Sequence, residues 1–453
     1  MSGGRAPRIG AIAAAALAVA AILLAASASR AAASYVCTGS AAADEAGLQP
    51  LIDAGGSIAL SGAEPCAGNF RAVGVTVTIA GTGGGATLDG GGTGSVLVAD
   101  DADVTLSNLT LRNGEGSGPD EGDDPAGANG GGVSATDSSL TLLGCRIVGN
   151  HAADQGGGIH LAEGSLMLVD STVSDNHSVA GGGGIDSDED VTLRVTGSTI
   201  SGNSTGPHGG GIEAFDGSLT VIDSTISGNS VTDRSDFRSG GGIWAGLADV
   251  SLTNSTVTGN RSTEFGGGIG YSGGAGTSLT LVATTVSSNH ADAGGGGIRN
   301  DAYYGDAVLS ILRSTVARNT AGQGAGIDAL ALHGFTSSVS VESSTITGNR
   351  ARDLGGGIDS FVDPSGGSTV VTVTSSTIGS RSHRLNDGNQ AAFGGGIAAN
   401  GSNGTASVVL RPGTALVANV ATFDGGGVFL RNGATLVSGP RVLMLLNRPN
   451  AVG

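Results

Sequence analysis

The chain is poor in the side chains that fill ordinary globular cores. Only 3% of its 453 residues are aromatic, with a single Trp, and only 13% are charged, whereas 85 are Gly. This composition excludes a thick core of large side chains, and the Gly residues lack the period of three that collagen requires. With 39% apolar residues, the chain is not typical of a disordered protein either. A repeat fold is the remaining expectation.

Lysine is absent, so all 21 basic residues are Arg, and the 39 acidic residues give a net charge of −18. An acidic chain without a basic cluster is not expected to bind nucleic acid or anionic membranes. The Ala- and Gly-rich composition without Lys suggests a GC-rich bacterial genome. We expect a monomeric protein that is secreted or held at the cell surface of a bacterium.

The N-terminus has the features of a secretory signal peptide. Residues 1–8 contain two Arg residues, an Ala- and Leu-rich run follows, and small residues at positions 31–33 form a cleavage site. We expect residues 1–33 to be removed, although the apolar run could instead stay as an anchor. No second apolar run follows, which predicts no membrane span in the mature chain.

The rest of the chain divides at the borders of a repeat region. Residues 34–72 are expected to form an N-terminal cap, residues 73–440 a parallel β-helix, and residues 441–453 a C-terminal cap. In the first cap, residues 44–56 carry apolar side chains at helical spacing and predict a short capping helix.

Three cysteines leave one unpaired in an exported protein. Cys37 and Cys66 flank the short segment before the repeats, so we pair them as a disulfide of the N-terminal cap. Cys145 falls at an apolar repeat position and is expected to be a buried thiol.

The repeat consists of short words that return about every 26 to 31 residues. One is GGGI, another is SLTL, and a third is ST-[IV]-x-x-N. Apolar and polar residues alternate within them, which predicts short strands with one face inward. Three short strands per period cannot bury themselves singly, but stacked copies enclose one apolar lumen.

The third word ends in an Asn that we expect to lie in a left-handed turn and to hydrogen-bond its copies above and below. The clearest copies of this structural Asn ladder are Asn150, Asn176, Asn203, Asn229, Asn260, Asn289, Asn319 and Asn349.

GGGI alternating with ST-[IV]-x-x-N resembles the right-handed parallel β-helix repeat proteins of bacteria, in the pectate-lyase-like superfamily. The same alternation is similar to the GGAI and FxxN repeats of chlamydial polymorphic outer-membrane proteins. The resemblance covers about residues 73–447. It implies an all-β chain that forms a single right-handed parallel β-helix of about a dozen coils. It is weakly specific for function.

No catalytic set is recognisable, so the catalytic residues are unknown. Lyases of this superfamily use a basic side chain and calcium held by Asp residues, and polygalacturonase-like members use clustered Asp residues with a His. The nearest words here, around Asp100, Asp123 and His208, lack the flanking residues of those motifs. A groove with two or more carboxylates and an Arg would favour an enzyme, whereas scattered charges would favour a binding protein.

No metal site and no organic cofactor are expected. His151, His177 and His290 follow the Asn of the third word, and we interpret them as turn residues, because exposed His residues without a third ligand do not make a zinc site. The acidic runs at residues 115–127 and 186–190 are interpreted as solvated loops, and calcium is the one ion that their carboxylates would bind.

The aromatic residues give the clearest functional signal. Eight of the 14 lie between a GGGI word and the following strand, and acidic residues begin several of the same segments. Aromatic faces beside carboxylates suit sugar rings, although such side chains could also cover apolar gaps. The candidate glycan face consists of Phe215, Trp244, Tyr271, Tyr303, Tyr304, Glu213, Asp328 and Asp359.

The sequence therefore predicts a non-catalytic β-helix protein that acts as a binding, adhesion or structural module toward polysaccharide or cell-surface components. The alternative is a polysaccharide lyase or glycoside hydrolase of the pectate-lyase-like superfamily.

Overall fold

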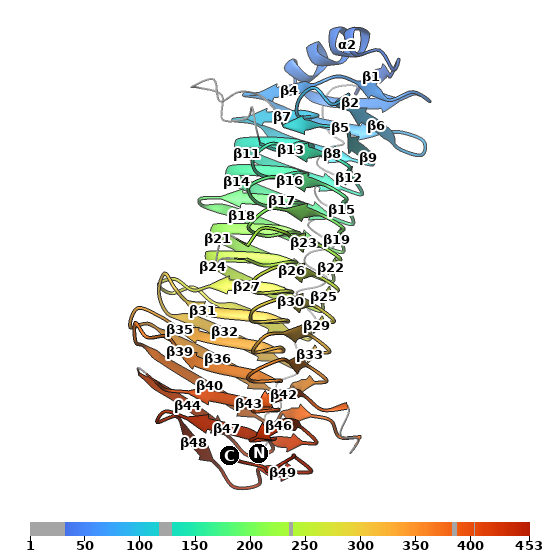
Figure 1. The fold of residues 1–453 in the computed structure, drawn as a ribbon. Coiled ribbons are helices and arrows are strands. Elements are labelled where there is room, and N and C mark those ends of the chain that lie inside the picture. Colours follow the sequence, from blue (N-terminus) through green and yellow to red (C-terminus); the bar gives the residue numbers. More distant parts are fainter. Residues whose placement is uncertain (1–31, 117–128, 235–238, 383–386, 403) are drawn as a thin grey trace, which may run out of the picture.

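The structure, a computed structural model, describes residues 32–116, 129–234, 239–382, 387–402 and 404–453. The chain winds into a long rod whose strands stack from the N-terminal end, in blue, to the C-terminal end, in red (Figure 1). Three parallel sheets of 24, 14 and 11 strands run along the rod, here called sheets 1, 2 and 3. The predicted all-β single parallel β-helix is confirmed, with about 14 turns.

The strands of sheet 1 are β1 (Ala33–Val36), β2 (Gly56–Ser61), β4 (Phe70–Val73), β5 (Thr76–Gly81), β7 (Leu97–Asp100), β8 (Asp103–Ser107), β11 (Val133–Leu143), β14 (Ile159–Val169), β17 (Ile185–Asp188), β18 (Val191–Thr196), β21 (Ile212–Ile222), β24 (Ile243–Thr253), β27 (Ile269–Ser272), β28 (Leu279–Val282), β31 (Ile298–Ala302), β32 (Ala307–Leu312), β35 (Ile327–Ala331), β36 (Thr336–Glu342), β39 (Ile358–Val362), β40 (Ser368–Thr374), β43 (Ile397–Asn400), β44 (Thr405–Leu410), β47 (Val428–Arg431) and β48 (Thr435–Ser438). The strands of sheet 2 are β3 (Cys66–Ala67), β6 (Ala86–Asp89), β9 (Leu109–Arg112), β12 (Arg146–Val148), β15 (Thr172–Ser174), β19 (Thr199–Ser201), β22 (Thr225–Ser227), β25 (Thr256–Thr258), β29 (Thr285–Ser287), β33 (Thr315–Ala317), β37 (Thr345–Thr347), β41 (Thr377–Gly379), β45 (Ala415–Val417) and β49 (Leu443–Leu445). The strands of sheet 3 are β10 (Glu115–Gly116), β13 (His151–Ala152), β16 (His177–Ser178), β20 (Ser204–Thr205), β23 (Ser230–Val231), β26 (Arg261–Ser262), β30 (His290–Ala291), β34 (Thr320–Ala321), β38 (Arg350–Ala351), β42 (Gln390–Phe393) and β46 (Val420–Asp424).

The repeated words stack in register, and their apolar residues fill one lumen. In β19 only Ile200 is fully buried, and it pairs with Ile226 of β22 in the next turn. The Ile of each GGGI word stacks in the same way, as Ile185 does on Ile212. Each turn adds one buried residue to each such column, and the stacked turns together supply the hydrophobic free energy that a single turn could not.

The three words are divided unequally among the three sheets. The GGGI and SLTL words both lie in sheet 1, and β21 carries both. Sheet 3 instead consists of short strands after the Asn, and it includes His151, His177 and His290. The interpretation of these His residues as turn residues is therefore wrong, because they belong to the parallel ladder.

A ladder of buried Asn side chains connects successive turns. The Nδ2 group of Asn203 donates to Oδ1 of Asn229 at 3.0 Å and to the carbonyl of Val173 at 3.0 Å. The predicted left-handed conformation lies one residue earlier, at Gly202 with φ 67° and at Gly228 with φ 65°. The Asn side chain points inward between turns, while the preceding residue makes the sharp bend.

The Gly residues of the GGGI word allow turns to approach closely. A Cβ at Gly184 would lie 2.6 Å from the carbonyl oxygen of Gly211 and 2.9 Å from Nδ2 of Asn203. Any larger side chain would push the turns apart at this bend.

Helix α2 (Ala41–Asp53) lies at the N-terminal end of the rod and begins three residues earlier than predicted (Figure 1). Its Leu48 and Ile52 are fully buried against the end of the lumen. The predicted Cys37–Cys66 disulfide is confirmed, and Cys145 is a free buried thiol. Strands β1, β2 and β4 of this N-terminal region already pair within sheet 1.

At the other end, β49 pairs with β45, and Val452 bridges to Val428. The predicted signal peptide lies almost entirely outside the described residues. Within the part of the chain that the structure describes, no helix is long and apolar enough to cross a membrane.

Candidate functional site

The first residue after each GGGI word forms a column on the outward side of sheet 1. Register places these residues next to one another in the order His160, Asp186, Glu213, Trp244, Gly270, Arg299, Asp328 and Asp359. All of them are buried, because the chain bends back sharply just before sheet 1. At this bend, a Cβ at Gly181 would lie 2.3 Å from Oε2 of Glu213, so the missing side chain makes room for the carboxylate.

The N-terminal part of this column gathers acidic and imidazole groups. Nδ1 of His160 lies 2.8 Å from Oδ2 of Asp186, and these side chains are 4% and 0% exposed. Asp188, two residues further along β17, is half-buried. One turn later, Nδ1 of His208 lies 3.1 Å from Oε1 of Glu213. The interpretation of the acidic run at 186–190 as a solvated loop is wrong for Asp186, which lies in a strand and is fully buried.

Burial determines the titration of this group. Burial raises the pKa of Asp186 to about 6, although the hydrogen bond from His160 acts in the opposite direction and lowers it. Burial, together with the charge of Asp186, raises the pKa of Asp188 to about 6. Burial, the largest single effect, lowers the pKa of His160, but the hydrogen bond to Asp186 and the charges of Asp186, Asp188 and Asp154 together outweigh it, so the pKa is raised.

A second charged group lies further along the same column. Arg299 forms ion pairs with Asp301 and Asp328, and its guanidinium lies 4.3 Å from the ring centre of Phe265. Burial, with the carboxylate of Asp328 beside it, raises the pKa of Asp359 to about 8. Carboxylates and an Arg thus converge as an enzyme would require, but all four charged side chains are buried instead of lining an open groove.

Four rings from three turns gather on the outward side of sheet 1, and we call Phe215, Tyr303, Tyr304 and His333 the aromatic patch. Tyr304 reaches back across two strands, so that its ring centre lies 6.2 Å from that of Phe215. Tyr303 packs edge-on against Tyr304 at 5.0 Å and against His333 at 5.6 Å, and it is 42% exposed.

Trp244 lies beneath this patch and stacks on Phe215 at 6.0 Å and on His208 at 5.1 Å. It is only 2% exposed, so it supports the patch and does not form its surface.

Several residues of the predicted glycan face are not at the surface. Tyr271 is the second residue after Ile269 of its GGGI word, so its side chain points into the lumen and is fully buried. Its hydroxyl group donates a hydrogen bond to Thr277. The first residue after the Ile of each word is also buried. This applies to Glu213, Trp244, Asp328 and Asp359. The structure brings together Phe215, Tyr303 and Tyr304 and excludes the other five from a surface face.

Sequence reasoning missed His160 and the charged group around it. The signal was present, because His160, Asp186 and Glu213 each follow directly after a GGGI-type word in three successive repeats. Aligning the repeats on that word would have placed these residues in one column.

A comparison with protein families agrees with the β-helix fold. The family described as right-handed beta helix region matches residues 76–249 and 131–312. The chain belongs to the right-handed β-helix family. The two overlapping matches cover more than half of the β-helix protein and include the whole acidic and imidazole group. A search of curated proteins finds no match. The family establishes the fold and leaves the activity open.

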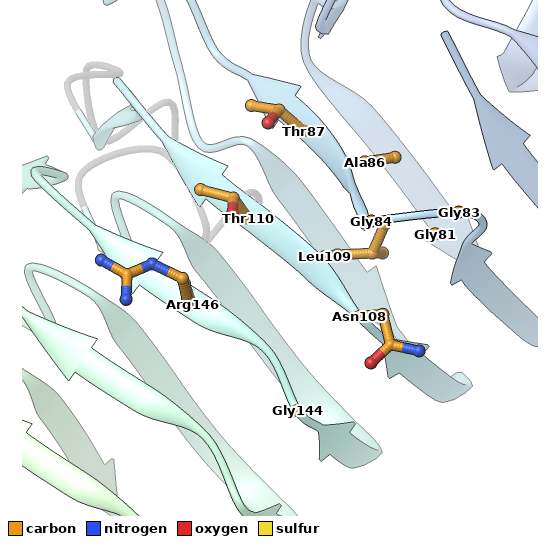
Figure 2. Close-up of a pocket in the computed structure, with 11 residues that line it drawn as sticks. Gly81, Gly83, Gly84, Ala86, Thr87, Asn108, Leu109, Thr110, Gly144 and Arg146 are labelled. Carbon is orange, nitrogen blue, oxygen red and sulfur yellow. The ribbon is translucent and has the colours of Figure 1, made fainter. Parts of the chain in front are cut away.

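A shallow hollow with a volume of about 450 Å³ lies on sheet 2, away from this column. Figure 2 shows Thr87, Thr110 and Arg146 side by side on β6, β9 and β12, with Asn108 and the Gly81–Gly85 loop at one end. Among the described residues that line it, Arg146 is the one charged side chain. None of the predicted site residues contributes to this hollow.

Proposed function

We propose that this β-helix is a secreted or cell-surface protein that binds a polysaccharide without cleaving it. The aromatic patch carries the proposal, because it brings rings from three separate turns together on one side of the rod. Aromatic rings offer apolar faces to the C–H faces of sugars, and the phenol groups of Tyr303 and Tyr304 offer polar contacts to sugar hydroxyls.

The charges around the patch favour a neutral polysaccharide. Asp188 and Glu213 lie beside Phe215 in the sheet, and the whole chain carries a net charge of −18. A polyanion such as a uronate polymer would be repelled by this field, whereas a neutral glucan, mannan or xylan would not. A rod with repeated weak contacts suits retention on a long polymer better than turnover.

Affinity electrophoresis in gels that contain a neutral polysaccharide tests the proposal. Stacking on one ring contributes about 0.5–1.5 kcal/mol, so Tyr303→Ala and Phe215→Ala should each weaken binding by about 3- to 10-fold. Phe423→Ala is the matched control, because Phe423 is 65% exposed but lies on β46 in sheet 3. Equal retardation of the wild type and both patch variants would contradict the proposal.

A polysaccharide lyase or glycoside hydrolase is the second candidate. The observation that favours it is the convergence of Asp186, Asp188 and Glu213 with His160 and His208 from adjacent turns, on the same side of sheet 1 as the aromatic patch. An enzyme would shorten the polymer that it binds, and Asp188→Asn, which alters a half-buried carboxylate, should then abolish shortening while retardation in the gel persists.

A further inference from the structure

His160, Asp186 and Asp188 form a compact group on two adjacent strands. Each side chain offers one nitrogen or oxygen atom, and the three atoms lie within 4.8 Å of one another. His160 lies on β14, and the two Asp residues lie on β17, which pairs with it in register. Rigid strands therefore hold all three groups, which suits a site that needs fixed geometry.

One atom of this group has no partner among the described residues. Asp186 is 0% exposed, its Oδ2 atom lies 2.8 Å from His160, and its Oδ1 atom makes no hydrogen bond to any residue that the structure describes. A buried carboxylate oxygen without a partner is costly and therefore rare in folded proteins. The surrounding charges are mainly negative, because Asp154, Glu189 and Glu213 act on the same group. A cation would satisfy the free oxygen and reduce the repulsion between the carboxylates.

We propose that His160, Asp186 and Asp188 bind one divalent cation of the zinc class. An imidazole nitrogen with two carboxylates is a ligand set typical of zinc and its neighbours in the first transition row, whereas Ca²⁺ and Mg²⁺ prefer oxygen ligands alone. Three protein ligands leave a coordination position for water or a ligand. Asp188 is half-buried, so solvent reaches one side of this group.

The hydrogen bonds around His160 indicate what the cation would displace. Its Nε2 atom lies 3.4 Å from Nδ2 of Asn129, whose amide can only donate, so Nδ1 carries the imidazole proton toward Asp186. A cation bound by Nδ1 and Asp186 takes the place of this hydrogen bond, and the proton moves to Nε2, so the imidazole stays neutral. Protons compete with the cation for the same ligand atoms, so binding should weaken as the pH falls.

The cation site does not depend on the proposed polysaccharide binding. It lies at one end of the aromatic patch, because Ser187 pairs with Ala214 and the next residues along the two strands are Asp188 and Phe215. The metal measurement uses no polysaccharide, so its failure would leave the proposed function standing.

Isothermal titration of the chelator-treated full chain with ZnCl₂ tests the proposal. We expect one Zn²⁺ per chain, with no displacement by a tenfold excess of CaCl₂ or MgCl₂. Loss of an outer-shell partner weakens metal binding by about 10- to 100-fold, so loss of a ligand in His160→Gln or Asp188→Asn should cost at least about 100-fold. Asp188 is half-buried, so Asp188→Asn should retain the circular dichroism spectrum and melting temperature of the wild type without metal.

His177→Gln is the control for adventitious binding, because His177 is an exposed imidazole stacked on His151 at 5.2 Å. We expect this variant to bind Zn²⁺ like the wild type. Absence of Zn²⁺ binding, displacement by Ca²⁺, unchanged affinity in Asp188→Asn, or loss of binding only in His177→Gln would each overturn the proposal.

Discussion

Removal of one Asn from the ladder should destabilise the β-helix far more than removal of a surface hydroxyl from the same turn. Asn229 is fully buried, and its Nδ2 group donates to the carbonyl of Ile200 and to Oδ1 of Asn260, each at 3.0 Å. Its Oδ1 atom accepts from the backbone N–H and from Nδ2 of Asn203, also at 3.0 Å. One side chain thus satisfies polar groups in two neighbouring turns.

Asn229→Ala would remove four side-chain hydrogen bonds and leave the backbone N–H of Asn203 without its acceptor. Nδ2 of Asn203 still donates to the carbonyl of Val173, and Oδ1 of Asn260 still accepts from the backbone N–H of residue 229. A hydrogen bond contributes about 0.5–1.5 kcal/mol net, so loss of the four bonds should lower the free energy of unfolding by about 2–6 kcal/mol.

Urea unfolding followed by circular dichroism measures this loss, and hydrogen exchange locates it. Since a solenoid unfolds in neighbouring units, the amides of β19 and β22 should lose protection before those of distant turns. Thr225→Ala is the matched control, because Thr225 is half-buried on the outward side of β22, and it should change stability by less than about 0.5 kcal/mol. An Asn229→Ala variant within about 1 kcal/mol of this control would show that the Asn ladder contributes little to stability.

Three further predictions follow from individual buried groups. Asp359 has a pKa raised by burial to about 8 from 3.8, so the folded chain holds its proton more tightly than the unfolded chain and stability should fall as the pH rises from about 4 to 8. Each pKa unit corresponds to about 1.4 kcal/mol, so this raised pKa sets an upper limit of about 6 kcal/mol on the loss of stability. Asp359→Asn should flatten the dependence of the urea midpoint on pH, and an unchanged slope would contradict this. Burial raises the pKa of the Cys145 thiol to about 11, so the native chain should resist a thiol reagent at pH 8 that modifies it in urea, and rapid native labelling would show that the thiol is accessible. Gly184→Ala places a methyl group 2.6 Å from a backbone oxygen of the next turn and should cost about 1–3 kcal/mol in urea unfolding, whereas a neutral result would mean that the turns can separate at the bend.

The fold was predictable because its signal recurs in every turn. The TIS word at residues 199–201 predicts a strand with one inward Ile, and the structure confirms both that pattern and its stacking on residues 225–227. The left-handed position was misplaced by one residue, because the sequence shows a constant Asn but not that its side chain is used between turns. Gly202 and Gly228, directly before the Asn, carry the positive φ.

The site was less predictable, because burial on the outward side of sheet 1 depends on how the chain bends before each strand. Tyr271 and Trp244 occupy similar segments of the sequence, yet one residue of offset turns Tyr271 into the lumen and Trp244 outward. The reach of Tyr304 back to Phe215 depends on the path of a loop, which no periodic pattern encodes. The pairing of His160 with Asp186 could have been predicted by aligning the repeats, since the register between turns of a solenoid follows directly from the repeat.

Retention and chain length of a neutral polysaccharide, measured in the same incubation with the purified protein, test the central claim most directly. We expect the protein to be retained on the polymer and size-exclusion chromatography to find the polymer's length unchanged, with and without Zn²⁺. Shortened chains would contradict a binding protein and turn attention to the carboxylates around Asp186. Absence of retention on every neutral polymer would contradict the assignment of the aromatic patch to sugars.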